Sequence, residues 1–183
     1  MLCNLTSLVE SCLSVRPTGP TRVALLIAGF PRKHHPINEF AKLLYLLREH
    51  SAKATFVVDW TEIRERGMCA SVGEIMQLLK CDGHELAIQF KTDVCGVAQL
   101  RQHAAEALHF MQRVYGITVV SVKVGCRLPI SHTDLQSLGV AIVDGLGAQI
   151  SITDNQDILN DLELLLHDLR ERQCVRVSDL KIV

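Results

Sequence analysis

Histidine and carboxylate side chains follow three apolar, strand-like runs of this sequence. His34 and His35 come soon after the first run, Asp59 directly follows the second, and Asp93 lies shortly after the third. The carboxyl ends of parallel strands gather at one edge of a sheet, where barrel enzymes build their sites. Imidazole and carboxylate groups together could bind a divalent metal or transfer protons. The simpler alternative is that these residues are solvated positions at helix starts.

Arg127 is a separate candidate, because a planar guanidinium can bind a carboxylate, a phosphate or a sugar hydroxyl. It could equally form a structural bridge with Asp154 across the mouth of a barrel. The adjacent His84 and Glu85 also have the chemistry of metal ligands. They stand at the start of a predicted strand, however, and so point away from the edge where a site would form. We predict a structural role for this pair.

Seven strand-like segments alternate with helical patterns, which defines the fold class. Short apolar runs bounded by turn residues predict buried strands at 23–28, 54–58, 84–89, 117–124, 140–143, 149–153 and 174–177. Helical periodicity occupies 36–50, 71–80, 97–115, 131–138 and 155–172. Strands joined by helical crossovers predict an α/β fold with a parallel sheet. Right-handed crossovers leave two architectures open, a distorted seven-stranded (β/α) barrel or an open doubly wound parallel sheet.

Composition fits one folded domain and excludes several function classes. The 183 residues are 48% apolar and 4% aromatic, with a formal net charge of -1. No basic run suggests nucleic-acid binding, and no apolar run reaches the ~18 residues that suggest a membrane span. The break at 16–20 divides the chain into an N-terminal arm or short helix, residues 1–20, and a single domain, residues 21–183.

The seven cysteines are irregularly spaced and include no C-x-x-C pair. This pattern offers neither a zinc ribbon nor a redox motif. We expect reduced thiols and, because the N-terminus is a poor secretory signal, a cytoplasmic protein.

Several segments between residues 21 and 180 resemble the polysaccharide deacetylases that share the NodB homology domain, a carbohydrate esterase type. The stretch 47–58, ending in Lys-Ala-Thr-Phe-Val-Val, is similar to the family's L-x-x-H-x-x-K-A-T-F-F-V, and 83–86, Gly-His-Glu-Leu, to its G-H-E-I. Three further segments occupy the positions of family motifs. Residues 26–31 align with the family's T-F-D-D-G-P, and residues 127–131 align with its R-P-P-Y-G. Residues 150–154 align with a family strand that ends in L-L-H-D. The resemblance implies a distorted barrel with seven strands.

The same resemblance implies a reaction in which a metal held by one aspartate and two histidines activates water to remove an acetyl group from a sugar. A second aspartate acts as the base and a histidine as the acid. Carried over by position, the base becomes Ala28, the metal ligands become Gly29, Gln89 and Asp93, and the acid becomes Thr153; Arg127 and Asp154 keep the family's residue types. Asp93 could still bind a metal, but one carboxylate beside a neutral amide is a weak divalent site.

The leading hypothesis is therefore a polysaccharide deacetylase-like domain that has lost metal-dependent deacetylation and acts in binding or assembly. It implies no cofactor, a carbohydrate or protein partner, and a possible homo-oligomer. The runner-up is an active hydrolase of N-acetylated sugars with a site rebuilt from His34, His35, Asp59 and Asp93, in which case zinc could be the metal. A third reading is an unrelated α/β enzyme with its ligand crevice elsewhere.

Overall fold

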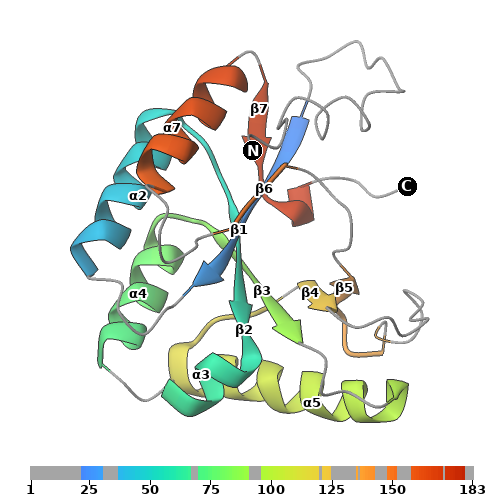
Figure 1. Ribbon diagram of the computed structural model, residues 1–183. Coiled ribbons are helices and arrows are strands. Elements are labelled where there is room, and N and C mark those ends of the chain that lie inside the picture. The colour runs from blue at the N-terminus through green and yellow to red at the C-terminus, as the bar shows by residue number, and fades with distance from the viewer. Residues whose placement is uncertain are drawn as a thin grey trace, which may run out of the picture.

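The computed structural model describes residues 22–30, 37–66, 70–90, 96–119, 121–124, 135, 137–142, 148–151, 158–170 and 172–179 (Figure 1). Its strands are β1 (Arg22–Phe30), β2 (Thr55–Asp59), β3 (Glu85–Phe90), β4 (Ser121–Val124), β5 (Ala141–Ile142), β6 (Ala148–Ser151) and β7 (Gln173–Val175). Its α-helices are α2 (Ile37–Glu49), α3 (Trp60–Arg66), α4 (Ala70–Cys81), α5 (Val97–Phe110) and α7 (Ile158–Asp168). A π-helical turn, Met111–Tyr115, and a 3-10 helix, Val177–Asp179, complete the described elements.

The seven strands form one parallel sheet, as predicted. The order is β5-β4-β3-β2-β1-β6, and β7 also pairs with β1. The first residues of β1 pair with β7, from Arg22 opposite Gln173, and its later residues pair with β2 and β6, with Leu26 opposite both Thr55 and Gln149. The chain therefore winds away from β1 as far as β5 and then returns to the other side of β1.

The two faces of the sheet differ in what covers them. One face packs against the helices, and its cluster contains Leu25 and Ile27 together with buried residues of all five helices. The opposite, inner face holds a cluster of strand residues only: Ala24, Leu26, Ala28, Val57 and Ala87. In a doubly wound sheet, helices after the reversal would cover the second face. Here α7 packs beside α2 on the same side as α4 (Figure 1), which is the arrangement of a barrel.

Local sequence explains the best-defined helices. In α2, Phe40, Leu43, Leu44 and Leu47 recur at helical spacing and are all buried, so this helix lies where the periodicity predicts it. The long helix predicted to stop at Gly116 does so, and Gly116 has a left-handed φ of 64°, which glycine adopts without a steric penalty. Its last turn is π-helical rather than α-helical.

Two sequence predictions about elements were incomplete. The short helix α3 was not predicted, because only Trp60 and Ile63 of its seven residues are buried apolar groups and two such residues give no visible period. The fourth strand was predicted at 117–124, but only Ser121–Val124 is a strand. The N-terminal arm, residues 1–20, and most of the predicted helix 131–138 lie outside the described residues.

None of the described helices combines the length and the apolar character that crossing a membrane requires. Two of the cysteines are described, both as free thiols: Cys81 is exposed and Cys174 is buried. Burial raises the pKa of the Cys174 thiol, which makes it less reactive.

Candidate functional site

Strand register places three polar side chains in one row at the carboxyl end of the sheet. Asp59 at the end of β2 lies opposite Gln89 on β3, and Gln89 lies opposite Lys123 on β4. Two residues earlier on the same strands, Val57 and Ala87 belong to the inner-face cluster. Because strand side chains alternate between faces, the three residues share the inner face, and all are half-buried. We call Asp59, Gln89 and Lys123 the mouth row.

The first strand is irregular beside this row. Ala28 pairs with Val57, but Phe30 pairs with Val58, so the register shifts and Gly29 is the extra residue. Bulges of this kind often adjoin active sites, where they redirect side chains. Ala28 is 6% exposed and packs in the inner-face cluster. The two positions that the resemblance assigns to the base and one metal ligand therefore lie at the mouth but carry no functional group.

Asp59 is also a helix cap. Its Oδ1 accepts a hydrogen bond of 2.8 Å from the backbone N–H of Thr61, which holds the carboxylate at the start of α3. Trp60 packs edge-on against Phe110 with ring centroids 5.7 Å apart. Its Nε1 is buried and has no hydrogen-bond partner within the described part of the chain. The contacts hold Asp59 in place and leave the indole on the helix side of the sheet.

Most of the sequence-predicted site residues are not described. Asp93, Arg127, Thr153 and Asp154 all lie outside the described residues, as do His34 and His35. The rebuilt site therefore remains a prediction, with only Asp59 of its members located. Lys123 was missed. The available signal was a lone charge inside the apolar run Val122 to Val124, because an ammonium there must reach a polar environment.

The described residues at the mouth do not fit a divalent metal. Glycine has no ligand atom at position 29, and the amide of Gln89 is neutral. Within the described ranges, no three His, Cys, Asp or Glu side chains lie close enough together to hold a metal ion. Asp93, the remaining implied ligand, is outside those ranges. No catalytic step through a metal follows from these residues.

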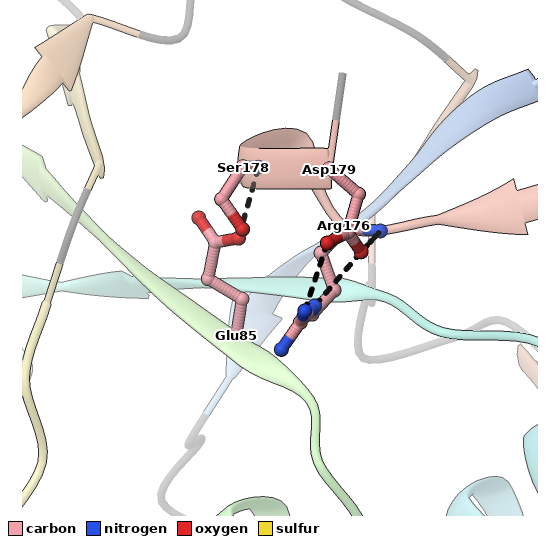
Figure 2. A network of polar contacts seen from close by, with 4 residues as sticks. All are labelled: Glu85, Arg176, Ser178 and Asp179. Carbon is pink, nitrogen blue, oxygen red and sulfur yellow. Dashed lines mark hydrogen bonds and ion pairs between the residues drawn. The ribbon is translucent and has the colours of Figure 1, made fainter. Parts of the chain in front are cut away.

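The amino end of the strands is a second polar region, built around a buried carboxylate. Glu85 is 7% exposed. Ser121 Oγ donates to its Oε1 at 2.8 Å, and the backbone N–H of Ser178 donates to its Oε2 at 3.1 Å. Figure 2 shows the Glu85 side chain reaching from β3 to the 3-10 helix that follows β7. The carboxylate thus ties that helix to the inner face of the sheet.

Further polar contacts stabilise the amino end of the strands. The Arg176 guanidinium donates twice to Asp179, at 2.8 and 2.9 Å (Figure 2), and these bonds lower the pKa of the Asp179 carboxyl. His84 Nδ1 accepts from the backbone N–H of Ala54 at 3.2 Å. Burial, followed by the nearby Lys53 charge, lowers the pKa of His84 to about 4. The imidazole is therefore neutral at pH 7, and His84 and Glu85 have the structural roles predicted for them.

A pocket of about 410 Å³ opens at this amino end between α4, β3 and the 3-10 helix. The ionisable residues of its lining are Lys80, His84, Glu85 and Arg176. Each of them already contacts another part of the protein; Lys80 Nζ, for example, donates to the Gly116 carbonyl at 3.1 Å. The polar groups therefore stabilise the chain around the pocket.

The sequence matches no family model and no curated protein, but the fold resembles solved structures. A family 4 carbohydrate esterase from Bacillus anthracis has a TM-score of 0.67 at 16% identity, over 96% of this chain and 90% of that one. A CE4 family pseudoenzyme from Bacillus anthracis has a TM-score of 0.67 at 11% identity, over 90% of this chain and 66% of that one. A mutant of that pseudoenzyme with restored enzymatic activity has a TM-score of 0.66 at 10% identity, over 90% and 68%.

These likenesses extend over most of the chain and agree with the seven-stranded parallel sheet. The chain therefore has the α/β fold of the CE4 polysaccharide deacetylases, a parallel sheet curved into a distorted barrel.

Proposed function

We propose that this domain has lost metal-dependent deacetylation and acts in binding or assembly. The observation that carries the proposal is the composition of the barrel mouth. Ala28 and Gly29 occupy the end of β1, and the neighbouring strands present the mouth row of Asp59, Gln89 and Lys123. This arrangement keeps the position of a barrel site with a different set of functional groups.

The chemistry of deacetylation explains why these positions matter. Hydrolysis of an amide requires an activated water and stabilisation of the developing oxyanion, which a bound metal supplies. Carboxylate and imidazole ligands hold such a metal. A methyl group at Ala28, a hydrogen at Gly29 and a neutral amide at Gln89 supply no carboxylate or imidazole ligand and no base.

The solved structures support loss of activity on this fold. One of them is described as a CE4 family pseudoenzyme, and a mutant of it as having restored enzymatic activity. The fold can therefore persist after activity is lost, and substitution can restore that activity. We infer that this chain has kept the fold and lost the activity.

The direct test is acetate release from acetylated chito-oligosaccharides in the presence of zinc. We expect none from the wild-type chain. A variant combining Ala28→Asp, Gly29→Asp, Gln89→His and Asp93→His should gain zinc binding, because it supplies one metal-binding aspartate, two histidines and a base. A matched control places a histidine at the exposed Arg64 of α3 and should bind no zinc. Zinc-dependent acetate release by the wild-type chain would contradict the proposal.

An active hydrolase with a rebuilt site is the second candidate. The mouth row favours it, because it brings a carboxylate and an ammonium to the same inner face. Under this alternative the wild-type chain releases acetate, and Asp59→Asn removes the activity while the exposed control Asp168→Asn keeps it.

Three further properties belong to the same proposal. We propose a carbohydrate or protein partner, with self-association into a homo-oligomer as one form of assembly. We propose a cytoplasmic location, since the cysteines form no recognisable disulfide framework. Size-exclusion chromatography with light scattering checks the oligomeric state.

A further inference from the structure

The pocket of about 410 Å³ at the amino end of the sheet is large enough for a small molecule. We call it the amino-end pocket. Lys80 lines it from the last turn of α4, His84 from just before β3, and Arg176 from between β7 and the 3-10 helix. Each of these side chains makes a contact within the protein, but that contact uses only part of its hydrogen-bonding capacity. The unused capacity consists of N–H donors.

His84 provides the best-defined of these donors. Its Nδ1 accepts from the backbone N–H of Ala54 at 3.2 Å and therefore carries no proton. The imidazole is neutral at pH 7, so its proton lies on Nε2. Among the described residues Nε2 has no hydrogen-bond partner, and Trp60 Nε1 is the only described side-chain nitrogen or oxygen that is both buried and without one. The Nε2–H group is therefore open to solvent, at the pocket that His84 lines.

Lys80 places a positive charge close to this imidazole. Its ammonium has three N–H groups, and one of them donates to the Gly116 carbonyl at 3.1 Å. The backbone N–H of His84 donates to the Leu79 carbonyl at 3.1 Å, in a tight turn that keeps Lys80 near His84. One ligand can therefore accept hydrogen bonds from both side chains.

Arg176 adds a second positive charge to the lining. Its Nε and Nη2 donate to Asp179, and Figure 2 shows the remaining guanidinium nitrogen turned away from that carboxylate. The lining also contains the buried Glu85 carboxylate, whose oxygens accept from Ser121 and Ser178. A second negative charge on a ligand would be repelled by this carboxylate, so the pocket favours a monoanion over a dianion.

The charges around His84 also favour an anion. Burial is the largest cause of its low pKa, and among the neighbouring charges Lys53 lowers that pKa most. The Asp82 carboxylate raises the pKa, whereas Arg176 and Arg48 lower it further. Three cations thus act against one anion, and the potential at the imidazole is positive. An acceptor that meets the Nε2–H group is therefore bound better as an anion than as a neutral molecule.

Apolar side chains form another part of the lining. Leu79, Leu86 and Ile117 are 1%, 3% and 8% exposed and border the pocket. Apolar walls beside a few placed polar groups are typical of small-molecule sites. A molecule with one carboxylate and an alkyl chain fits both parts of this lining.

We propose that the amino-end pocket binds a small monocarboxylate with a short alkyl chain, whose oxygens accept hydrogen bonds from His84 Nε2–H and from the Lys80 ammonium. The inference goes beyond the proposed function and does not depend on it, because neither residue belongs to the mouth row. It assigns a binding site to the end of the barrel opposite the mouth.

The test is an NMR titration of the full chain with butyrate, with butyramide and inorganic phosphate as comparisons. We expect butyrate to bind at least about tenfold more tightly than butyramide, the effect of one charge-assisted hydrogen bond, and more tightly than phosphate. The ring resonances of His84, assigned by their loss in His84→Asn, should shift with butyrate. Lys80→Met should weaken butyrate binding about tenfold or more, and Lys80→Arg should keep most of it. Lys42→Met, at an exposed position on α2, is the matched control and should bind as wild type.

Several results would overturn the inference. They are absence of butyrate binding, equal binding of butyramide, tighter binding of phosphate, unshifted His84 resonances, or an unchanged butyrate affinity in Lys80→Met. Circular dichroism checks that each variant is folded, and Lys80→Gln takes the place of Lys80→Met if that variant is not. Zinc content and acetate release are separate measurements on the same chain. The proposed function and this inference can therefore fail independently.

Discussion

At the amino end of the strands, the Glu85 carboxylate is buried and accepts hydrogen bonds from Ser121 and from the backbone of Ser178. At the carboxyl end, Asp59, Gln89 and Lys123 are half-buried in one row beside the small residues of β1. Polar groups of the first region bind other parts of the chain and hold elements together. Those of the second region lie where barrel folds place their sites. The polar groups of the amino end therefore maintain the fold, and we propose that the carboxyl end carries the function.

The largest effect should come from Glu85→Ala. Removing the carboxylate leaves the Ser121 hydroxyl and the Ser178 N–H without their partner, and each such loss costs about 1–3 kcal/mol. We expect the free energy of unfolding to fall by roughly 4 kcal/mol in urea titrations. Glu163→Ala, at an exposed position on α7, is the control and should change it by less than about 0.5 kcal/mol. A loss below about 1 kcal/mol at Glu85 would refute its structural role.

The pH dependence of stability should report His84. Its pKa is lowered to about 4 in the folded protein from 6.5, so the unfolded chain binds the proton more readily. The stabilisation is complete above about pH 6.5 and is lost as the pH falls toward 4, by up to about 3 kcal/mol. His84→Asn keeps an acceptor for the Ala54 N–H and should flatten this pH slope of the unfolding free energy. The control His50→Gln, at an exposed histidine, should keep the wild-type dependence of the unfolding free energy on pH. If His84→Asn also kept that dependence, the pKa of His84 would not be lowered by folding.

A smaller effect is expected from the ion pair between Arg176 and Asp179. Their side chains are 38% and 33% exposed, so water screens the attraction. A double-mutant cycle with Arg176→Gln and Asp179→Asn should give a coupling of about 1 kcal/mol. The pair Arg48–Asp82 at the same end, with Arg48 66% exposed, should couple by about 0.5 kcal/mol or less. The reverse ranking would contradict solvent exposure as the factor that sets the strength of these two ion pairs.

The smallest change in stability should come from Lys123→Met. Lys123 is only half-buried, and an apolar side chain of similar length keeps the packing of its stem and avoids the desolvation of an ammonium. We expect the unfolding free energy to change by less than about 1 kcal/mol. Thermal or urea unfolding measures it, with Lys42→Met, at an exposed position on α2, as the control. A loss as large as that of Glu85→Ala would place Lys123 among the residues that maintain the fold.

The sequence predicted most helices and strands of the fold well, because the spacing of apolar residues is a local property of the chain. The helix over 36–50 corresponds to α2, and the run 84–89 to β3, each within one residue. The short helix α3 escaped prediction because Trp60 and Ile63 alone show no period. Lys123 was missed for a different reason. Its place in the mouth row depends on the register of β4 against β3, and pairing between strands distant in sequence cannot be derived from local pattern.

The proposed function requires that the mouth of this barrel hold no metal. The most direct measurement is the zinc content of the full chain, by elemental mass spectrometry, after equilibration with zinc and dialysis. The four-residue variant at Ala28, Gly29, Gln89 and Asp93 serves as the positive control. We predict far less than one zinc ion per wild-type chain. One zinc ion per wild-type chain, retained through dialysis, would contradict the claim.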